Sequence, residues 1–365
     1  MTKAKNISYK QLAVLLVLSR LFSDGADLRA VEAGYSMQRF TALIISYVIL
    51  FLLYLPLIFL AYRNPGESVI SIIAGKSKVL GWLCGMFIAL ALLASAVSTM
   101  CSMSLYASST VLSEAPLILL MILPLAVAAL AAWKGIQGTA RSGILFAGIL
   151  AAFLLMIMLS LWKLFDWEWL HMGFFEEPKQ LMGQVAKQLG RNSELLAFGV
   201  LMEYVNERTA RTVYWYIPAI MLMQALKLLI QIIVLGPYLD SASFPFFTIS
   251  SLSDIVVFQR LDGINVAVWL LMCIVRVALA LLCIRAIFTR LWGENAGKRC
   301  VWISAAVIAL TSLLLGGTSS SALSMDGISS SYVILLIGGV LIPVIGLIAV
   351  KMKNRGESGA SEKSG

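Results

Sequence analysis

Histidine and charge are scarce in this chain, and each shortage excludes classes of function. The 365 residues hold a single histidine, His171. Charged residues make up 13% of the chain, against about 25% in an average soluble domain. One histidine cannot build a multi-histidine metal site, and it leaves little basis for a Ser-His triad. We therefore expect neither a metal nor a cofactor.

Cysteines are few and dispersed. The five cysteines form no CxxC pair, and four lie inside apolar runs: Cys84, Cys101, Cys273 and Cys283. Such residues are typical of small, buried hydrophobic positions. The sequence also contains no nucleophile–base set, no metal-ligand cluster and no phosphate-binding loop, so we expect no enzymatic activity.

Apolar sequence is what the chain has in abundance. Hydrophobic residues make up 60% of it and the mean hydropathy is +0.91, whereas soluble domains average about 45–50% apolar residues. An excess of this size indicates lipid-facing surface, so the sequence predicts an all-α polytopic membrane protein. The net charge of +9 gathers at the ends of the apolar runs, where Lys and Arg set topology. We therefore expect the lipid bilayer, and no nucleic acid, as a partner.

The apolar runs predict about ten transmembrane helices. A helix needs about 20 apolar residues to cross the bilayer core. With the N-terminus inside, 18 of the 28 Lys and Arg fall on inside segments and 8 on outside segments. This asymmetry predicts that both termini are cytoplasmic. The expected spans are residues 7–22, 40–62, 79–104, 116–133, 143–165, 192–205, 213–235, 264–288, 301–315 and 332–350.

Spans 1 and 6 are short and contain polar residues, and they hold corresponding positions in two halves of five spans. An odd number of spans per half inverts the second half relative to the first. The pattern therefore predicts a 5+5 inverted repeat with discontinuous spans 1 and 6, which is where transporters place a binding site. Between spans 5 and 6, the spacing of Leu181, Val185 and Leu189 predicts a short amphipathic surface helix.

The chain is expected to form one integral membrane domain, residues 1–352. Its halves are spans 1–5 at 7–165 and spans 6–10 at 192–350. The charged, Ser/Gly-rich residues 353–365 predict a disordered cytoplasmic tail.

Four ionisable residues lie within or beside spans 6–8: Glu194, Glu203, Lys227 and Arg276. Charges at membrane depth usually face the protein interior or a cavity, which favours an inward-facing Arg276. Glu194 is either a binding residue or the ion-pair partner of Lys227, because both are expected at a similar depth. Lys227 can also extend toward the interface, and Glu203 can simply be solvated at the inner end of span 6.

Two polar clusters complete the candidate site. Ser19, Arg20, Ser23 and Asp24 interrupt span 1, or else mark an ordinary span end. In span 3 a polar stripe follows helical spacing and favours either ligand contact or helix packing. The stripe consists of Ser95, Ser98, Thr99, Ser102 and Tyr106.

The outward segment 236–263 is expected to be a long loop. It contains Phe244, Pro245 and two further phenylalanines. Further along, Arg260 and Asp262 are close enough to fix a turn, and no catalytic role follows from them.

An ordered set of motifs resembles the spore germination permeases, the B subunits of endospore germinant receptors. The set covers roughly residues 7–350, and Gln-Arg-Leu-Asp followed seven residues later by Trp is its most specific part. It consists of Ile7-Ser8-x-x-Gln11-Leu12, Glu194, Phe244-Pro245, Phe258-Gln259-Arg260-Leu261-Asp262, Trp269 and Arg276.

That family is similar to the amino acid–polyamine–organocation transporters, with their LeuT-like five-plus-five fold. The resemblance implies a pocket where spans 1 and 6 break, flanked by spans 3 and 8. It implies assembly with an A-type membrane subunit and a C-type lipoprotein subunit in the spore inner membrane. The candidate ligand-binding residues are Ser19, Phe22, Ser23, Asp24, Ser98, Ser102, Tyr106, Glu194, Phe198, Gly199 and Arg276, and the structural or ion-pair residues are Lys227, Glu203, Pro245, Arg260 and Asp262.

Two functional hypotheses share this pocket. In the first, a small germinant such as an amino acid binds and the signal passes to partner subunits. In the second, the chain is an H⁺- or Na⁺-coupled amino acid transporter. One departure concerns the ligand: the family usually has Gly-rich sequence at the first break, whereas Leu21, Phe22 and Ser23 stand there in this chain. Their bulk predicts a narrower or reshaped pocket.

Overall fold

A computed structural model describes most of the chain. It describes the backbone of residues 7–25, 36–111, 114–170, 178–205, 208–242, 244–253, 262–315, 327 and 331–361. Within those ranges, the side chains of residues 23–25, 36, 240 and 352–361 are not described. Arg260 and His171 lie outside the described residues.

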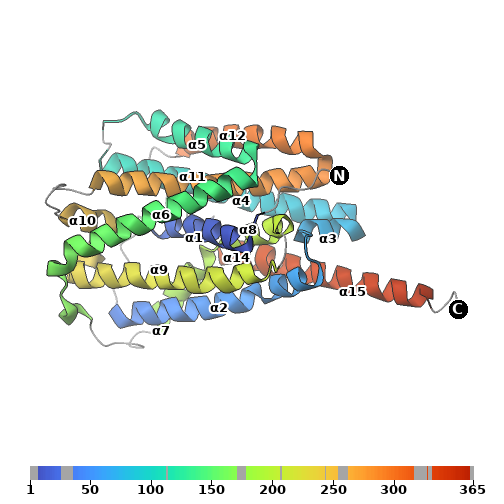
Figure 1. The fold of residues 1–365 in the computed structure, drawn as a ribbon, viewed down its shortest axis with the longest axis horizontal. Helices are drawn as coiled ribbons and strands as arrows, with labels where there is room; N and C mark the ends of the chain where they lie inside the picture. Colours follow the sequence, from blue (N-terminus) through green and yellow to red (C-terminus); the bar gives the residue numbers. More distant parts are fainter. Residues whose placement is uncertain are drawn as a thin grey trace.

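Eight spans of the described chain are helical, long and apolar enough to cross a membrane. In Figure 1 they run side by side along the long axis of the molecule. They match expected spans 2–5 and 7–10. They are α2 (Ser36–Arg63), α4 (Lys78–Ser109), α5 (Leu117–Lys134), α6 (Ile136–Leu161), α9 (Arg211–Leu235), α11 (Asp262–Trp292), α12 (Glu294–Leu315) and the run α14–η5–α15 (Tyr332–Leu336, Ile337–Leu341, Ile342–Ser361).

Lipid-facing and core-facing helices differ in the share of their residues that is buried inside the protein. In α11, 78% of the most apolar window is buried inside the protein, whereas the figure for α6 is 22%. Exposed tryptophans lie near both ends of the bundle, for example Trp162 and Trp292, as expected for aromatic side chains at the membrane interfaces. α11 is therefore the central helix of the bundle. Figure 1 also shows α15 continuing beyond the bundle to Ser361, so part of the expected disordered tail is helical.

The first span is a short helix, α1 (Tyr9–Gly25). It is helical throughout, so Ser19, Arg20, Ser23 and Asp24 lie in its C-terminal turns rather than in a break. Ser19 and Arg20 are buried. Polar groups can persist in an apolar helix when neighbouring elements supply partners, and α1 packs against α6, α8, α9 and α11.

The sixth span consists of two pieces, α7 (Pro178–Gly190) and α8 (Glu194–Leu201), followed by the 3₁₀ turn η3 (Met202–Tyr204). The amphipathic pattern of α7 was predicted correctly, since Leu181 and Val185 are buried. However, they pack against Ala42 of α2, and α7 lies along that span. α7 is therefore the first half of the sixth span and not a separate surface helix.

Part of the expected loop at 236–263 is also helical. α10 (Pro245–Leu252) begins with Pro245 in its first turn, where a proline loses no hydrogen bond. Pro245 and Phe246 are buried, and α10 packs on α9 and α11. This short helix covers one end of the bundle. Residues 254–261, which include Arg260, lie outside the described chain.

Gly81 allows a close crossing between α4 and the short helix α3 (Val69–Lys76). A Cβ atom at Gly81 would lie 2.7 Å from Ala74 Cα and 2.9 Å from Ala74 N, so backbone would have to move. We expect Gly81→Ala to lower the free energy of unfolding by about 1–3 kcal/mol. Thermal unfolding of the detergent-purified protein would measure it. Gly75→Ala is the matched control, because a Cβ there meets nothing within 4 Å. Equal unfolding temperatures for the two variants would contradict the close contact between α3 and α4 at Gly81.

Candidate functional site

The interruption of the sixth span lies at residues 191–193, and side chains stabilise both of its ends. Asn192 Nδ2 donates to the carbonyl oxygens of Gln188 at 2.8 Å and Leu189 at 3.3 Å. These carbonyls belong to the last turn of α7, where helical partners are missing. Ser193 is the residue before α8, and its hydroxyl makes no capping bond to that helix. This hydroxyl can therefore form a hydrogen bond with a side chain of a neighbouring helix.

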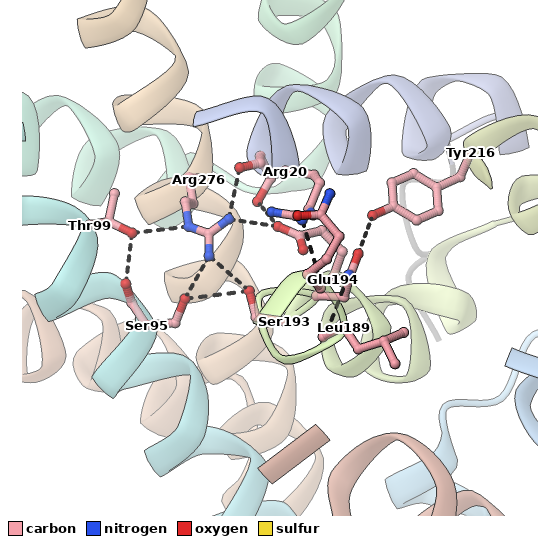
Figure 2. A network of polar contacts seen from close by, with 11 residues as sticks. Arg20, Ser95, Thr99, Leu189, Ser193, Glu194, Tyr216 and Arg276 are labelled. Carbon is pink, nitrogen blue, oxygen red and sulfur yellow. Dashed lines mark hydrogen bonds and ion pairs between the residues drawn. The ribbon is translucent and has the colours of Figure 1, made fainter. Parts of the chain in front are cut away.

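Arg276 of α11 lies opposite this interruption, and its guanidinium uses every N–H group it has. Guanidinium carries five N–H donors, and this one makes five hydrogen bonds (Figure 2). The three guanidinium nitrogens donate these bonds to helices α1, α4 and α8 and to the residue that precedes α8. The acceptors are Thr99 Oγ1 (3.0 Å, from Nε), Ser19 O (2.8 Å) and Glu194 Oε1 (2.8 Å, both from Nη1), and Ser95 Oγ and Ser193 Oγ (3.1 Å each, from Nη2).

Glu194 is the anionic partner and is almost completely buried, with 1% of its surface exposed. Its Oε1 atom accepts from Arg276 and, at 2.7 Å, from the hydroxyl of Ser19. Because Glu194 begins α8, its negative charge also lies at the positive end of a helix dipole. Its second oxygen, Oε2, is buried and has no hydrogen-bond partner among the described residues. The carboxylate is thus paired on one side only.

Two consecutive residues of α1 contact the two halves of the sixth span. Ser19 bonds to Glu194 at the start of α8. Arg20, which is fully buried, donates from Nη2 to the carbonyl of Gln188 near the end of α7 at 3.4 Å. Any relative movement of α7 and α8 therefore changes contacts with α1.

We call the group formed by Arg276 and the side chains around it the latch. Its members are Arg276, Glu194, Ser19, Ser95, Thr99 and Ser193.

The latch contains a buried ion pair between Arg276 and Glu194, and the energetics of a buried pair differ from those of a surface pair. Arg276 has 8% of its surface exposed. Removing one member of a buried pair typically costs about 3–5 kcal/mol, because the other charge is left uncompensated. The four hydroxyl and carbonyl acceptors around Arg276 reduce the desolvation penalty of the intact pair. The latch is consequently stable when complete and sensitive to the loss of either charge.

Aromatic side chains pack on two sides of the latch. On the α2 side, Tyr54 lies 5.9 Å from Phe198 and 6.0 Å from Tyr216, centroid to centroid. The Tyr216 hydroxyl donates to Asn192 Oδ1 at 3.4 Å. This group connects α2 and α9 to the interruption in span 6.

On the side of α10, Trp269 of α11 makes edge contacts with Phe22 at 6.2 Å and Tyr106 at 6.5 Å. The Tyr106 hydroxyl accepts from Asn265 Nδ2 at 3.1 Å. Edge-to-face aromatic pairs are favourable beyond the area they bury. These residues close the bundle between the latch and α10.

The structure brings together only part of the predicted ligand-binding set. Ser19, Glu194 and Arg276 meet in the latch. Phe22 and Tyr106 meet through Trp269, as described above. Ser98 and Ser102 are buried, but neither bonds to Arg276. The backbone of Ser23 and Asp24 is helical, and their side chains are outside the described atoms.

Phe198 and Gly199 both contact neighbouring helices. Phe198 packs on Tyr54. A Cβ at Gly199 would lie 3.2 Å from Leu57 and 3.3 Å from Val69, so this glycine allows α8 to approach α2 and α3. Both residues contribute to helix packing, and their contact with a ligand stays a prediction.

The structural and ion-pair predictions have mixed outcomes. Glu194 pairs with Arg276 and not with Lys227, which lines a separate cavity on α9. Glu203 is partly buried in η3. Asp262 begins α11 and accepts at 2.9 Å from the backbone N–H of Gly263. Pro245 is in the first turn of α10 as described above.

Sequence reasoning missed Asn192 and Ser193 as site residues, and from the polar stripe of α4 it chose Ser98, Ser102 and Tyr106 as candidates rather than Ser95 and Thr99. Ser95 and Thr99, four residues apart on one helix face, are the stripe members that bond to Arg276. The signal for Asn192 and Ser193 was present. Both stand directly before Glu194, and Asn and Ser are favoured where a helix begins.

The sequence matches the family model described as spore germination protein over residues 6–319. The chain belongs to the spore germination protein family. No curated protein matches it. A solved structure of a Na⁺-coupled sialic acid symporter, in a substrate-bound outward-open state, is similar with a TM-score of 0.60 and 12% identity, over 95% of this chain and 89% of that one. At this identity the likeness concerns the fold alone.

Family and fold agree on the class of protein. This spore germination protein is an all-α membrane protein of permease type with a LeuT-like transporter fold. In such folds, substrate and ion sites lie near the bilayer midplane, where discontinuous helices meet. In this protein the corresponding region, between α1, α4, α8 and α11, is filled by the latch.

Proposed function

We propose that this protein is the B-type, ligand-sensing subunit of a spore germinant receptor. A small germinant, such as an amino acid, would bind between spans 1, 3, 6 and 8 and shift a conformational equilibrium. The size of that shift is set by the difference in the germinant's affinity for the two states. The observation that carries the proposal is the latch, because one ion pair couples the interrupted span to three other helices.

The resting state supports sensing in a specific way. All five guanidinium donors are used by the protein itself, and Glu194 is paired through one oxygen. A germinant with a carboxylate or an ammonium group competes chemically for one of these two charges. Breaking the pair would free α8 from α1 and α11, and a movement of this kind can be transmitted to a neighbouring subunit.

The proposed partners are an A-type membrane subunit and a C-type lipoprotein subunit, in the spore inner membrane, with both termini of this chain in the cytoplasm. Membership of the spore germination family supports this setting. The excess of Lys and Arg on the inside segments supports the orientation. Co-purification of this chain with an A-type and a C-type subunit would test the assembly.

Coupled transport is the second candidate, and the transporter fold favours it. The same pocket would then carry an amino acid together with H⁺ or Na⁺. Uptake of labelled amino acids into proteoliposomes, with an imposed Na⁺ or H⁺ gradient, separates the two functions. The sensor proposal predicts no gradient-driven accumulation, and robust accumulation would contradict it.

Glu194→Gln tests the sensor role in spores. The variant keeps the size of the side chain and removes the charge that pairs with Arg276. We expect the amino acid concentration for half-maximal germination to change by roughly 5–150-fold, the range of typical coupling free energies. The measurement is the loss of refractility in spores exposed to a mixture of the twenty proteinogenic amino acids.

Glu294→Gln is the matched control, because Glu294 forms an exposed pair with Lys298 at 3.0 Å on the surface of α12. We expect this variant to germinate like wild type. A normal response from Glu194→Gln spores, at normal protein level, would contradict the proposal.

A further inference from the structure

A cavity of about 50 Å³ lies between α1, α6, α9, α10 and α11, and its wall is almost wholly apolar. Leu21, Phe153 and Phe246 are among the residues that line it, and all three are buried. Lys227 is the single ionisable residue among the thirteen described residues of the lining, and it already has an interaction partner in the chain. The cavity therefore offers a ligand hydrocarbon surface and no uncompensated charge.

Water does not suit this cavity. By volume alone there is room for about four waters, but a buried water needs about two to four polar partners, and apolar cavities stay dry. A cavity left empty deprives the side chains around it of dispersion contacts. Because an apolar occupant restores these contacts, the lining favours hydrocarbon.

The mouth of the cavity opens between α6 and α9 toward the lipid. Met158 on α6 and Leu226 on α9 belong to the lining, yet 37% and 36% of their surfaces are exposed. Leu226 lies about 22 Å along α9 from Arg211 and about 13 Å from Leu235, at about 1.5 Å per residue. The hydrocarbon core of a bilayer is about 30 Å thick. This mouth is therefore continuous with the lipid-facing surface of two spans, and acyl chains are the molecules that meet it.

The end of an acyl chain fits the cavity by size as well as by chemistry. A volume of about 50 Å³ admits a few carbon atoms of a flexible chain and not a whole lipid. Met158, Met223 and Met272 supply side chains that adapt to its shape. Lipid tails are as apolar as leucine, so the gain comes from packing and not from leaving water. By the usual cost of an unfilled cavity, that gain corresponds to roughly an eightfold preference, which the ordering of the chain reduces.

The cavity lies close to the latch without including its ion pair. Leu21 lies two residues after Ser19 on α1, and Met272 lies one helical turn before Arg276 on α11. Arg276 and Glu194 do not belong to the lining. A chain in the cavity would therefore contact two helices that carry latch residues, next to those residues.

We propose that this cavity is a lateral site for the end of a membrane lipid's acyl chain, which enters between α6 and α9 and is held by packing alone. The site lies apart from the region between α1, α4, α8 and α11. Its existence does not depend on the sensor role proposed above.

Photolabelling of the full chain in phosphatidylcholine nanodiscs tests the site. The probe is a phosphatidylcholine that carries a diazirine near the end of one acyl chain, and labelled residues are identified by mass spectrometry. Label on Phe153 and Met272 is diagnostic, because these lining residues are buried and a chain on the surface does not reach them. We expect both to be labelled, whereas a lipid with the diazirine in its headgroup should label neither.

Two substitutions on α9 provide the comparison. Leu226→Trp fills the mouth of the cavity and should lower the labelling of Phe153 and Met272 several-fold. Leu222→Trp is the matched control, since Leu222 is 59% exposed one turn earlier on α9 and does not line the cavity. It should leave the labelling of both residues unchanged.

Met223→Ala enlarges the cavity without closing its mouth, so it should raise the labelling of Phe153 and Met272. Absence of label on these two residues, no loss of label in Leu226→Trp, or an equal loss in Leu222→Trp would overturn the site. Label from a diazirine of adamantane, with none from the lipid probe, would show that small apolar molecules enter the cavity and that acyl chains do not.

Discussion

Arg276→Met should lower the free energy of unfolding by about 3–5 kcal/mol, because it removes the ion-pair partner of the buried Glu194. In a thermal scan of purified protein this corresponds to a fall of roughly 5–15 °C. Five hydrogen bonds are lost together with the ion pair. The substitution therefore removes the hydrogen bonds of Arg276 to α1, α4 and α8 at once.

A double-mutant cycle with Glu194→Gln separates the ion pair from general damage. When both charges are removed, the loss should be smaller than the sum of the single losses by about 1–3 kcal/mol. Lys298→Met breaks the exposed pair with Glu294 and should leave the unfolding temperature unchanged. Additive losses in the cycle would show that Arg276 and Glu194 do not act as a pair.

Gly339→Leu should displace α8 and disable the latch indirectly. Gly339 lies in the π-helical turn η5 of the last span. A Cβ there would lie 2.0 Å from Leu195 Cδ2 and 2.7 Å from Leu195 Cγ. Leu195 directly follows Glu194 and is fully buried, so it has little room to move. We expect a loss of about 1–3 kcal/mol in unfolding free energy, together with a germination defect like that of Glu194→Gln.

Gly148→Leu provides the control for this substitution. Gly148 lies on α6, and a Cβ there meets nothing within 4 Å. The same change in side-chain volume should therefore have no effect on unfolding or on germination. If the Gly339 variant is as stable and responsive as the Gly148 variant, the contact between η5 and α8 is not required.

Hydropathy alone predicted the long spans, because a run of about 20 apolar residues has few alternatives in a bilayer. The sixth span was harder to delimit. Its first half, α7, carries charged and amide side chains such as Lys179 and Lys187, and its pattern is that of an interfacial helix. Only the tertiary contact with α2 shows that α7 belongs to the span. Sequence periodicity holds no information about such a contact.

The charged residues of the site could be predicted from the sequence, whereas the pairing between them depends on how the helices are rotated. An arginine and a glutamate within apolar spans are functional candidates by default, and both are in the latch. The partner of Glu194 was not predictable, since Arg276 and Lys227 were both compatible with the sequence. The choice depends on which face of α9 and α11 turns toward α8. Likewise Ser95 and Ser98 have equal standing in the sequence, and only the rotation of α4 selects Ser95.

If ligand binding releases the latch, the backbone amides of α8 should exchange with solvent faster. Hydrogen exchange at α8 measures this. The measurement compares amide exchange in peptides covering Glu194–Leu201, with and without the mixture of twenty amino acids that is used in the spore assay. The protein is the wild-type chain co-purified with its partner subunits. We expect faster exchange at α8 when the mixture is present, and no such change in Glu194→Gln. Unchanged α8 exchange in preparations from spores that germinate normally would contradict it.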